Sequence, residues 1–383
     1  MSNWNERIDY GKYYCLMSIK TPNTLATMAS ILVTIATSVA LGLSPLKYSG
    51  YMFAGILILY FLAMFIIGIS NYKKDVNIPL LLTSNIPPLD VLKESMKKHK
   101  YTPWRIDALK REFGPSAFRE EKLTTVEISP QLINCNDDLW AISRTIRDKI
   151  HIIGKGLIGL NNVRFHLYVT EEVPTTIALI TGILLGDEHA NFTIYTGGAQ
   201  GRIEKILDSE NITGMKVEEV QVPDTSKLSF VADIYNREGK LEKENLSLKE
   251  VLELVRNGFT RFILLVDLTT SPLNRLSISD FAKNEDVDYN GFMIAKTKDK
   301  IEGLVKFNEL QFLSMHFSNN IAEIVEEGLN ADGRIVLTMK VPHPFNIVMG
   351  YKLCHQTNLE ILHYNRRMGE YLEPILLKEI FAT

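Results

Sequence analysis

The chain has 383 residues, of which 46% are apolar, and a formal net charge of −3. This length and composition suit two or three domains with a large core, and the charge gives no sign of a polyanionic partner such as DNA. Cys15, Cys135 and Cys354 lie far apart without a CxxC pair. This argues against a disulfide framework or a zinc site and favours a reducing compartment.

Two uncharged apolar runs come first along the chain. Residues 24–43 and 50–69 have twenty residues each and contain no Asp, Glu, Lys, Arg or His. Twenty helical residues rise about 30 Å, the thickness of the hydrocarbon core of a bilayer. The runs predict a transmembrane hairpin within an N-terminal segment, residues 1–74. A buried core hairpin or a signal peptide is the alternative, but a signal peptide would begin earlier and end in a cleavage site.

The basic residues around this hairpin predict its orientation. Only Lys47 lies in the turn, whereas the outer ends carry Arg7, Lys12, Lys20, Lys73 and Lys74. The positive-inside rule therefore places both termini in the cytoplasm. Because neither span carries an ionisable group, a transporter, a pump or a membrane-embedded protease is not expected.

Residues 75–130 are predicted to form a connector, because "NIPPLD" (85–90) interrupts any helix that continues from the membrane. From there on, strands and helices alternate. Helices are expected at about 89–100, 103–113, 136–156, 174–186, 199–208, 247–257, 315–329 and 343–355. Strands are expected at 164–169, 191–196, 216–222, 261–268, 291–296, 334–341 and 358–364. Several strands are apolar nearly throughout, which is typical of parallel sheets covered on both faces, so the predicted class is α/β.

Two βαβ stretches share a proline, a glycine and a tyrosine in the same order: Pro174, Gly182 and Tyr195, then Pro342, Gly350 and Tyr364. The proline and the glycine are eight residues apart in both stretches. These landmarks predict two related halves, about 131–258 and 259–383. Proline suits the first turn of a helix, and glycine inside a helix indicates close packing, here expected between helix and sheet.

In an open α/β sheet, ligands bind beyond the carboxyl ends of the strands, where the helices begin. The N–H groups of the first helical turn and the helix dipole suit an anion such as phosphate. If the halves face each other, both helix starts border one shared cleft.

This arrangement and the closing segment "PHPFNIVMGYKLCHQTNLEILHYNRRMGEYLEP" resemble the SAVED domain of bacterial CBASS anti-phage systems, a fusion of two CARF-like Rossmann units. The resemblance covers about residues 120–383 and includes a late tyrosine and proline, Tyr371 and Pro374. It implies a SAVED-like cyclic-nucleotide-binding domain at 131–383.

Together with the hairpin, the chain is similar to the transmembrane SAVED effectors. The resemblance then implies a protein of the bacterial inner membrane that binds a cyclic di- or trinucleotide made by a nucleotidyltransferase of the CD-NTase type. On binding it would form a homo-oligomer and disrupt the membrane in abortive infection, with the lipid bilayer as its target and no DNA binding.

Candidate ligand-binding residues follow the ends of the matched strands. In the first half, Thr170, Thr175 and Thr176 suit a phosphate or a ribose, with ordinary helix capping as the alternative. Lys340 offers charge to a phosphate, and His343 suits stacking on a base, with a solvated position near the helix cap as the alternative. Phe345 suits stacking on a base, and Asn346 suits pairing with adenine. Tyr195 and Tyr364 suit stacking on bases, with burial as core aromatics as the alternative. Arg366 and Arg367 follow a strand end and suit a phosphate, with a solvated turn as the alternative.

We find no catalytic motif: HExxH, GxSxG and a P-loop are all absent from the sequence, and the glycines of "YTGGAQGR" (195–202) miss the GxGxxG spacing. An enzyme, a cofactor and a metal site are therefore not expected. Two other hypotheses stay open, a membrane-bound Rossmann-type nucleotide-dependent enzyme and a nucleotide-sensing regulator of a membrane partner.

Overall fold

The computed structural model describes most of the chain beyond residue 45 in ranges that end at residue 382. These are 46–71, 76–83, 125–128, 133–156, 163–170, 172–197, 203–212, 226–269, 289–299, 307–365 and 368–382, with residues 7, 8, 11, 12, 15, 33, 37, 41, 42, 278 and 281. The chain forms two compact units, a smaller one that contains helix α3 and a larger one that contains both main sheets.

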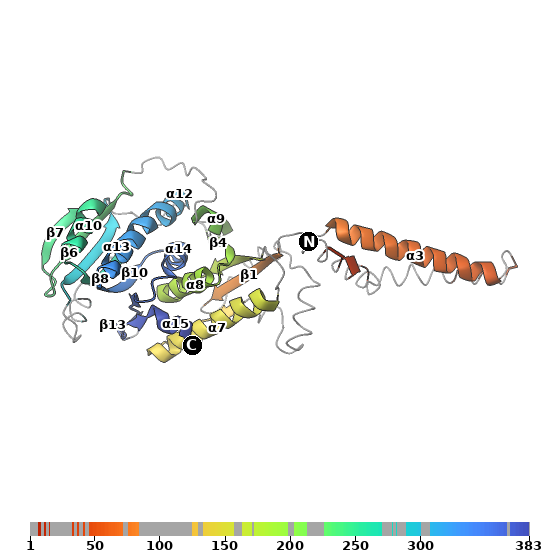
Figure 1. The fold of residues 1–383 in the computed structure, drawn as a ribbon, viewed down its shortest axis with the longest axis horizontal. Coiled ribbons are helices and arrows are strands. Elements are labelled where there is room, and N and C mark those ends of the chain that lie inside the picture. The colour runs from red at the N-terminus through yellow and green to blue at the C-terminus, as the bar shows by residue number, and fades with distance from the viewer. Residues whose placement is uncertain are drawn as a thin grey trace. The chain divides into compact units, whose positions relative to one another are not determined.

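The smaller unit is built on α3 (Leu46–Asn71), which includes the expected second span, 50–69 (Figure 1). Several apolar side chains of α3 are more than half exposed: Tyr51, Ile58, Leu59, Leu62 and Ile66. On another face, Gly11 lies against Phe65, and the thiol of Cys15 donates to the Phe61 carbonyl at 3.0 Å.

The first expected span, 24–43, lies outside the described residues except for positions 33, 37, 41 and 42. Among the helices that the structure describes, none meets the combined requirement of length and apolar character for crossing a membrane.

The larger unit contains a five-stranded sheet with the order β2-β1-β3-β4-β5. β1 and β2 are parallel, as are β3 and β4, whereas β5 runs antiparallel to β4. The strands are β1 (Val76–Thr83), β2 (Thr125–Glu127), β3 (Val163–Val169), β4 (Asn191–Gly197) and β5 (Ile203–Asp208). Its helices are α7 (Asn136–Gly156), α8 (Thr175–Asp187) and α9 (Ser209–Ile212).

A seven-stranded sheet has the order β14-β11-β10-β8-β9-β6-β7. Its strands are β6 (Phe230–Tyr235), β7 (Leu241–Leu246), β8 (Arg261–Asp267), β9 (Gly291–Thr297), β10 (Arg334–Lys340), β11 (Glu360–Ile361) and β14 (Ile375–Leu376). The helices are α10 (Leu248–Arg256), α12 (Phe307–Phe312), the π-helical turn η2 (Leu313–Phe317), α13 (Ser318–Asn330), α14 (His343–Leu353) and α15 (Leu377–Ala382). A separate hairpin joins β12 (Tyr364–Asn365) to β13 (Glu370–Tyr371).

The two sheets repeat one pattern. The order β2-β1-β3-β4-β5 corresponds to β9-β8-β10-β11-β14, and the elements follow one another along the chain in the same sequence. In both sheets the first two strands of this order are parallel, the next pair is parallel around a helix (α8 or α14), and the last strand is antiparallel. The structure is therefore mixed α/β, and both sheets contain parallel strands.

Several elements differ from the sequence-based expectations. Residues 199–208 were expected to be helical, but 203–208 form β5, because pairing with β4 overrides the local preference for helix. β1 and β2 lie inside the segment 75–130 assigned to a connector, and β6 and β7 pair in the second sheet although they precede residue 258. The strand expected at 216–222 and the helices expected at 89–100 and 103–113 lie outside the described residues.

The repeated glycines pack helix against helix, where helix against sheet was expected. A Cβ at Gly182 of α8 would lie 2.0 Å from the carbonyl oxygen of Ile347 in α14. A Cβ at Gly350 of α14 would lie 2.0 Å from the carbonyl oxygen of Leu179 in α8. Since any larger residue would separate the two backbones, these glycines permit α8 and α14 to lie side by side (Figure 1).

Candidate functional site

The helices α8 and α14 begin in the same unusual way. Their N-cap residues are Pro174 and Pro342, neither helix start has a hydrogen bond from a capping side chain, and neither first turn contains an acidic residue. By contrast, α10 begins with a complete capping box formed by Ser247 and Glu250. Within the described part of the chain, the first-turn N–H groups of α8 and α14 thus lack the N-cap side-chain acceptor that usually satisfies them.

The two helix starts lie next to each other because the helices run parallel. Gly182 meets Ile347 near the middle of both helices, and Gly186 meets Cys354 near their ends. At the other end, the hydroxyl of Thr175 donates to the Met339 carbonyl at 3.2 Å, just before α14. Two parallel helix dipoles therefore present their positive ends together, which is unfavourable for the helices and favourable for an anion. We call this region the paired-helix site, comprising Thr175, Thr176, Lys340, His343 and His363.

At this site a hydrogen bond joins a helix of the five-stranded sheet to the segment that follows a strand of the seven-stranded sheet. The Thr176 hydroxyl, at the start of α8, lies 3.0 Å from Nδ1 of His363, which follows β11. Burial lowers the pKa of His363 to about 4, so the ring is neutral at pH 7. His363 is not among the residues predicted from the sequence, although it directly precedes Tyr364, which is.

Thr170 and Lys340 lie at strand ends, and His343 lies in the first turn of α14. Thr170 follows β3, and its amide donates to the Leu82 carbonyl at 3.1 Å. Its hydroxyl oxygen is buried and has no hydrogen-bond partner among the described residues. Lys340 ends β10 opposite Asp267 of β8, and His343 is the first residue of α14; both are half-buried.

Two candidate residues are buried where base contacts were expected. Phe345 is 0% exposed, and its ring packs at 6.1 Å against that of Phe317, so it is a core residue and not a stacking surface. Asn346 is also 0% exposed, and its amide nitrogen donates to the carbonyls of Val341 and Pro342 at 3.1 and 3.3 Å. Its amide therefore braces the start of α14. Its carbonyl oxygen has no partner among the described residues.

The two matched tyrosines are half-buried, each next to a second tyrosine. Tyr195 stacks on Tyr168 with centroids 4.8 Å apart, and Tyr364 contacts Tyr371 edge-on at 5.0 Å. The hydroxyl of Tyr195 lies 2.9 Å from Nδ1 of His166, and burial raises its pKa. Arg366 and Arg367 lie outside the described residues.

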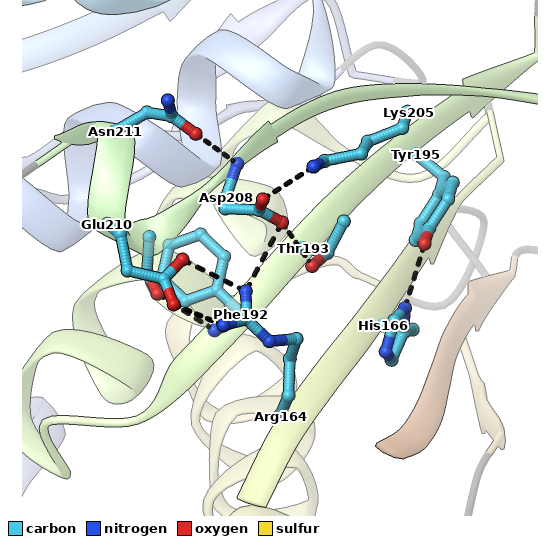
Figure 2. A network of polar contacts seen from close by, with 10 residues as sticks. Arg164, His166, Phe192, Thr193, Tyr195, Lys205, Asp208, Glu210 and Asn211 are labelled. Carbon is cyan, nitrogen blue, oxygen red and sulfur yellow. Dashed lines mark hydrogen bonds and ion pairs between the residues drawn. The ribbon is translucent and has the colours of Figure 1, made fainter. Parts of the chain in front are cut away.

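A second polar cluster lies on the five-stranded sheet around Asp208, as Figure 2 shows. Its carboxylate accepts from Thr193 at 2.5 Å and pairs with Lys205 at 2.5 Å and with Arg164 at 3.3 Å. Burial alone would raise the pKa of Asp208, but the bonds from Lys205 and Thr193 and the charges of Lys205 and Arg164 outweigh it and lower the pKa.

The same cluster contains Glu210, whose carboxylate accepts hydrogen bonds from both terminal nitrogens of Arg164. The hydrogen bond from Arg164 lowers the pKa of Glu210. Two cations thus face two carboxylates, and we interpret the cluster as a structural tie between β3, β4, β5 and α9. Within the described parts of the chain, no group of three or more His, Cys, Asp or Glu is placed to hold a metal ion.

Comparison with known proteins gives only distant likenesses. No protein-family model and no curated protein sequence matches the chain. Two similar structures are the Acinetobacter baumannii Cap4 SAVED/CARF-domain containing receptor with the cyclic trinucleotides 3′3′3′-cAAA and 2′3′3′-cAAA. For these, identity is 10%, the TM-scores are 0.42 and 0.43, and the alignments cover 78% and 84% of this chain.

A third similar structure is the Moraxella osloensis Cap4 SAVED/CARF-domain containing receptor, with 10% identity, a TM-score of 0.40 and 84% of this chain covered. The chain spans about half the length of these structures, at 51%, 54% and 53% of theirs. At these TM-scores the likeness does not by itself establish a shared fold or a shared function.

Proposed function

We propose that this protein is a membrane-anchored effector that senses a cyclic oligonucleotide at the paired-helix site. The observation that carries the proposal is the pair of parallel helices α8 and α14, which begin side by side without capping side chains or acidic residues. The sequence resemblance to the SAVED domain supports the same ligand class.

The chemistry of the site favours an anion that contacts both helices at once. First-turn N–H groups and two aligned dipoles favour phosphate, and Lys340 adds a positive charge at the end of β10. A cyclic oligonucleotide carries several phosphates within one compact ring, so one molecule would contact both helix starts. The half-buried Tyr195 and Tyr364 each offer a ring to a base.

The effector part of the proposal concerns the N-terminal segment. Residues 24–43 and 50–69 carry no charge, and α3 exposes a row of apolar side chains that lipid or other copies of the chain would cover. Ligand binding to the cytoplasmic unit would favour a homo-oligomer, gather these segments and disrupt the bacterial inner membrane during infection. For this, the ligand must bind the assembled state more tightly than the resting state.

The test uses the full-length chain, purified in mild detergent, against a panel of cyclic di-AMP, cyclic di-GMP, cyclic GMP–AMP and cyclic tri-AMP. At 100 times its dissociation constant, a ligand should stabilise the fold by about 2.7 kcal/mol, which thermal unfolding detects easily. Light scattering then reports assembly, and dye release from liposomes reports membrane damage. A panel without any stabilising member would contradict the proposed ligand class, whereas binding without dye release would contradict only the effector step.

A further inference from the structure

The helix before β10 contains one π-helical turn, η2, and this turn contacts α14. α12, η2 and α13 form one continuous helix over 307–330, with helical dihedral angles at both junctions of η2. Within η2, the Ser318 amide donates to the Leu313 carbonyl, five residues back. Such a π turn contains one residue more than an α turn, and π turns occur frequently at functional sites.

Side chains hold the carbonyls of this π turn. The Ser318 hydroxyl donates to the Ser314 carbonyl at 2.6 Å, and Nζ of Lys352, in the last turn of α14, donates to the Met315 carbonyl at 3.2 Å. Lys352 also donates to Oδ1 of Asn319. Burial lowers the pKa of Lys352 to about 8, so the ammonium group remains mostly charged at neutral pH. The present position of the π turn therefore depends in part on α14.

The π turn also contacts the beginning of α14. The ring of Phe317, the last residue of η2, lies 6.1 Å from the ring of Phe345, which is two residues after His343. The Phe317 ring also lies 5.3 Å from the ring of Phe230, the first residue of β6. Both the first and the last turn of α14 thus touch the π turn, and any axial movement of α14 changes both contacts.

We propose that the π turn Leu313–Phe317 transmits occupancy of the paired-helix site to the helix 307–330. This inference rests on the proposed function. An anion at the start of α14 attracts the helix along its axis, releases Lys352 from the Met315 carbonyl and lets the π turn move by one residue. The Met315 carbonyl keeps a second side-chain donor when Lys352 leaves, because the Ser318 hydroxyl also donates to it at 3.5 Å, so both arrangements satisfy this group and form a two-state element.

The proposal predicts the sign of a mutational effect. Because coupling between two sites is reciprocal, weakening the hold of Lys352 favours the arrangement that the ligand favours. Lys352→Met removes the donor at nearly constant side-chain length. It should tighten ligand binding about tenfold, since the loss of a hydrogen bond from a charged donor shifts an equilibrium by at least that factor. A purely structural role of Lys352 would lower stability and leave the affinity unchanged.

The experiment compares the wild type, Lys352→Met, Lys352→Arg and the control Lys249→Met, which changes an exposed lysine of α10. Calorimetry measures the affinity of the full-length chain for the cyclic oligonucleotide of the panel that binds the wild type. Hydrogen exchange is measured for peptides covering 313–319, with 248–256 as a reference.

We expect the ligand to speed exchange in 313–319 about tenfold, Lys352→Met to do so without ligand, and Lys352→Arg to resemble the wild type. Ligand binding without a change of exchange in 313–319, or equal affinities of wild type and Lys352→Met, would overturn the transmission alone. If nothing in the panel binds the wild type, the proposed function falls and the transmission falls with it.

Discussion

Replacing Gly182 or Gly350 by alanine tests the contact that brings the two helix starts together. A Cβ at either position would lie 2.0 Å from a carbonyl oxygen of the other helix, whereas ordinary contacts begin at 3.4 Å, so the backbones must separate by about 1.4 Å. The obstacle is backbone and cannot rotate away. Overpacking of this kind costs up to about 3 kcal/mol, and alanine returns about 1 kcal/mol of helix propensity. We therefore expect Gly182→Ala to lower the free energy of unfolding by about 2 kcal/mol.

The two substitutions should not be additive. A single separation of α8 and α14 relieves both clashes, so the overpacking cost of about 3 kcal/mol arises once while both alanines contribute helix propensity. Gly182→Ala with Gly350→Ala should therefore cost about 1 kcal/mol, less than the sum of the single effects. Urea unfolding of the full-length chain, followed by circular dichroism, measures all variants. Gly55→Ala is the control, because no described residue outside the backbone of its own helix lies within 4 Å of a Cβ at that glycine. If Gly182→Ala had the same free energy of unfolding as the wild type, the described helix contact would be refuted. It would also be refuted if the effects of the two substitutions on that free energy were strictly additive.

Two further predictions concern stability and pH. His363 has a pKa of about 4 in the fold against 6.5 as its ordinary value, so protonation of the unfolded chain lowers stability as the pH falls from 6.5 to 4. The loss is up to about 3 kcal/mol, and His363→Asn should remove it while His355→Asn, an exposed control, retains it. A wild type with pH-independent unfolding over that range would contradict the burial of His363. Asp208 has a lowered pKa, so its contribution is present above its ordinary value of 3.8 and is lost as the pH falls below it. Asp208→Asn should cost about 2 kcal/mol at pH 7, with a difference from wild type that disappears in acid, whereas the exposed Asp148→Asn should cost little. A difference that persists at pH 2 would refute the ionic role of Asp208.

The helices of the candidate site could be predicted from sequence because their signals are local. Proline at the start and an apolar run placed α8 and α14 within two residues of their observed ends. The apolar character of both helices on all sides also explains the misjudged roles of Phe345 and Asn346. A helix that is apolar all round is buried all round, and residues 344–350 are all buried.

Non-local contacts explain the rest. A glycine within a helix signals a close approach, but the sequence does not say whether a sheet or another helix approaches. The contact between Thr176 and His363 joins residues 187 positions apart, and no local pattern announces it. The segment 203–208 contains Glu, Lys, Ile and Leu, which suit a helix, yet pairing with β4 makes it a strand.

The central claim is that the adjacent, uncapped starts of α8 and α14 hold an anionic ligand, and one substitution tests it directly. Thr175→Glu places a carboxylate in the first turn of α8. There it interacts favourably with the positive end of the helix dipole and repels a bound anion. Calorimetry with the panel compares the full-length wild type, Thr175→Glu and the exposed control Thr145→Glu. The account predicts that one cyclic oligonucleotide binds the wild type and Thr145→Glu alike and binds Thr175→Glu at least tenfold more weakly, with the stability of that variant retained. Equal affinity of Thr175→Glu and wild type would contradict it.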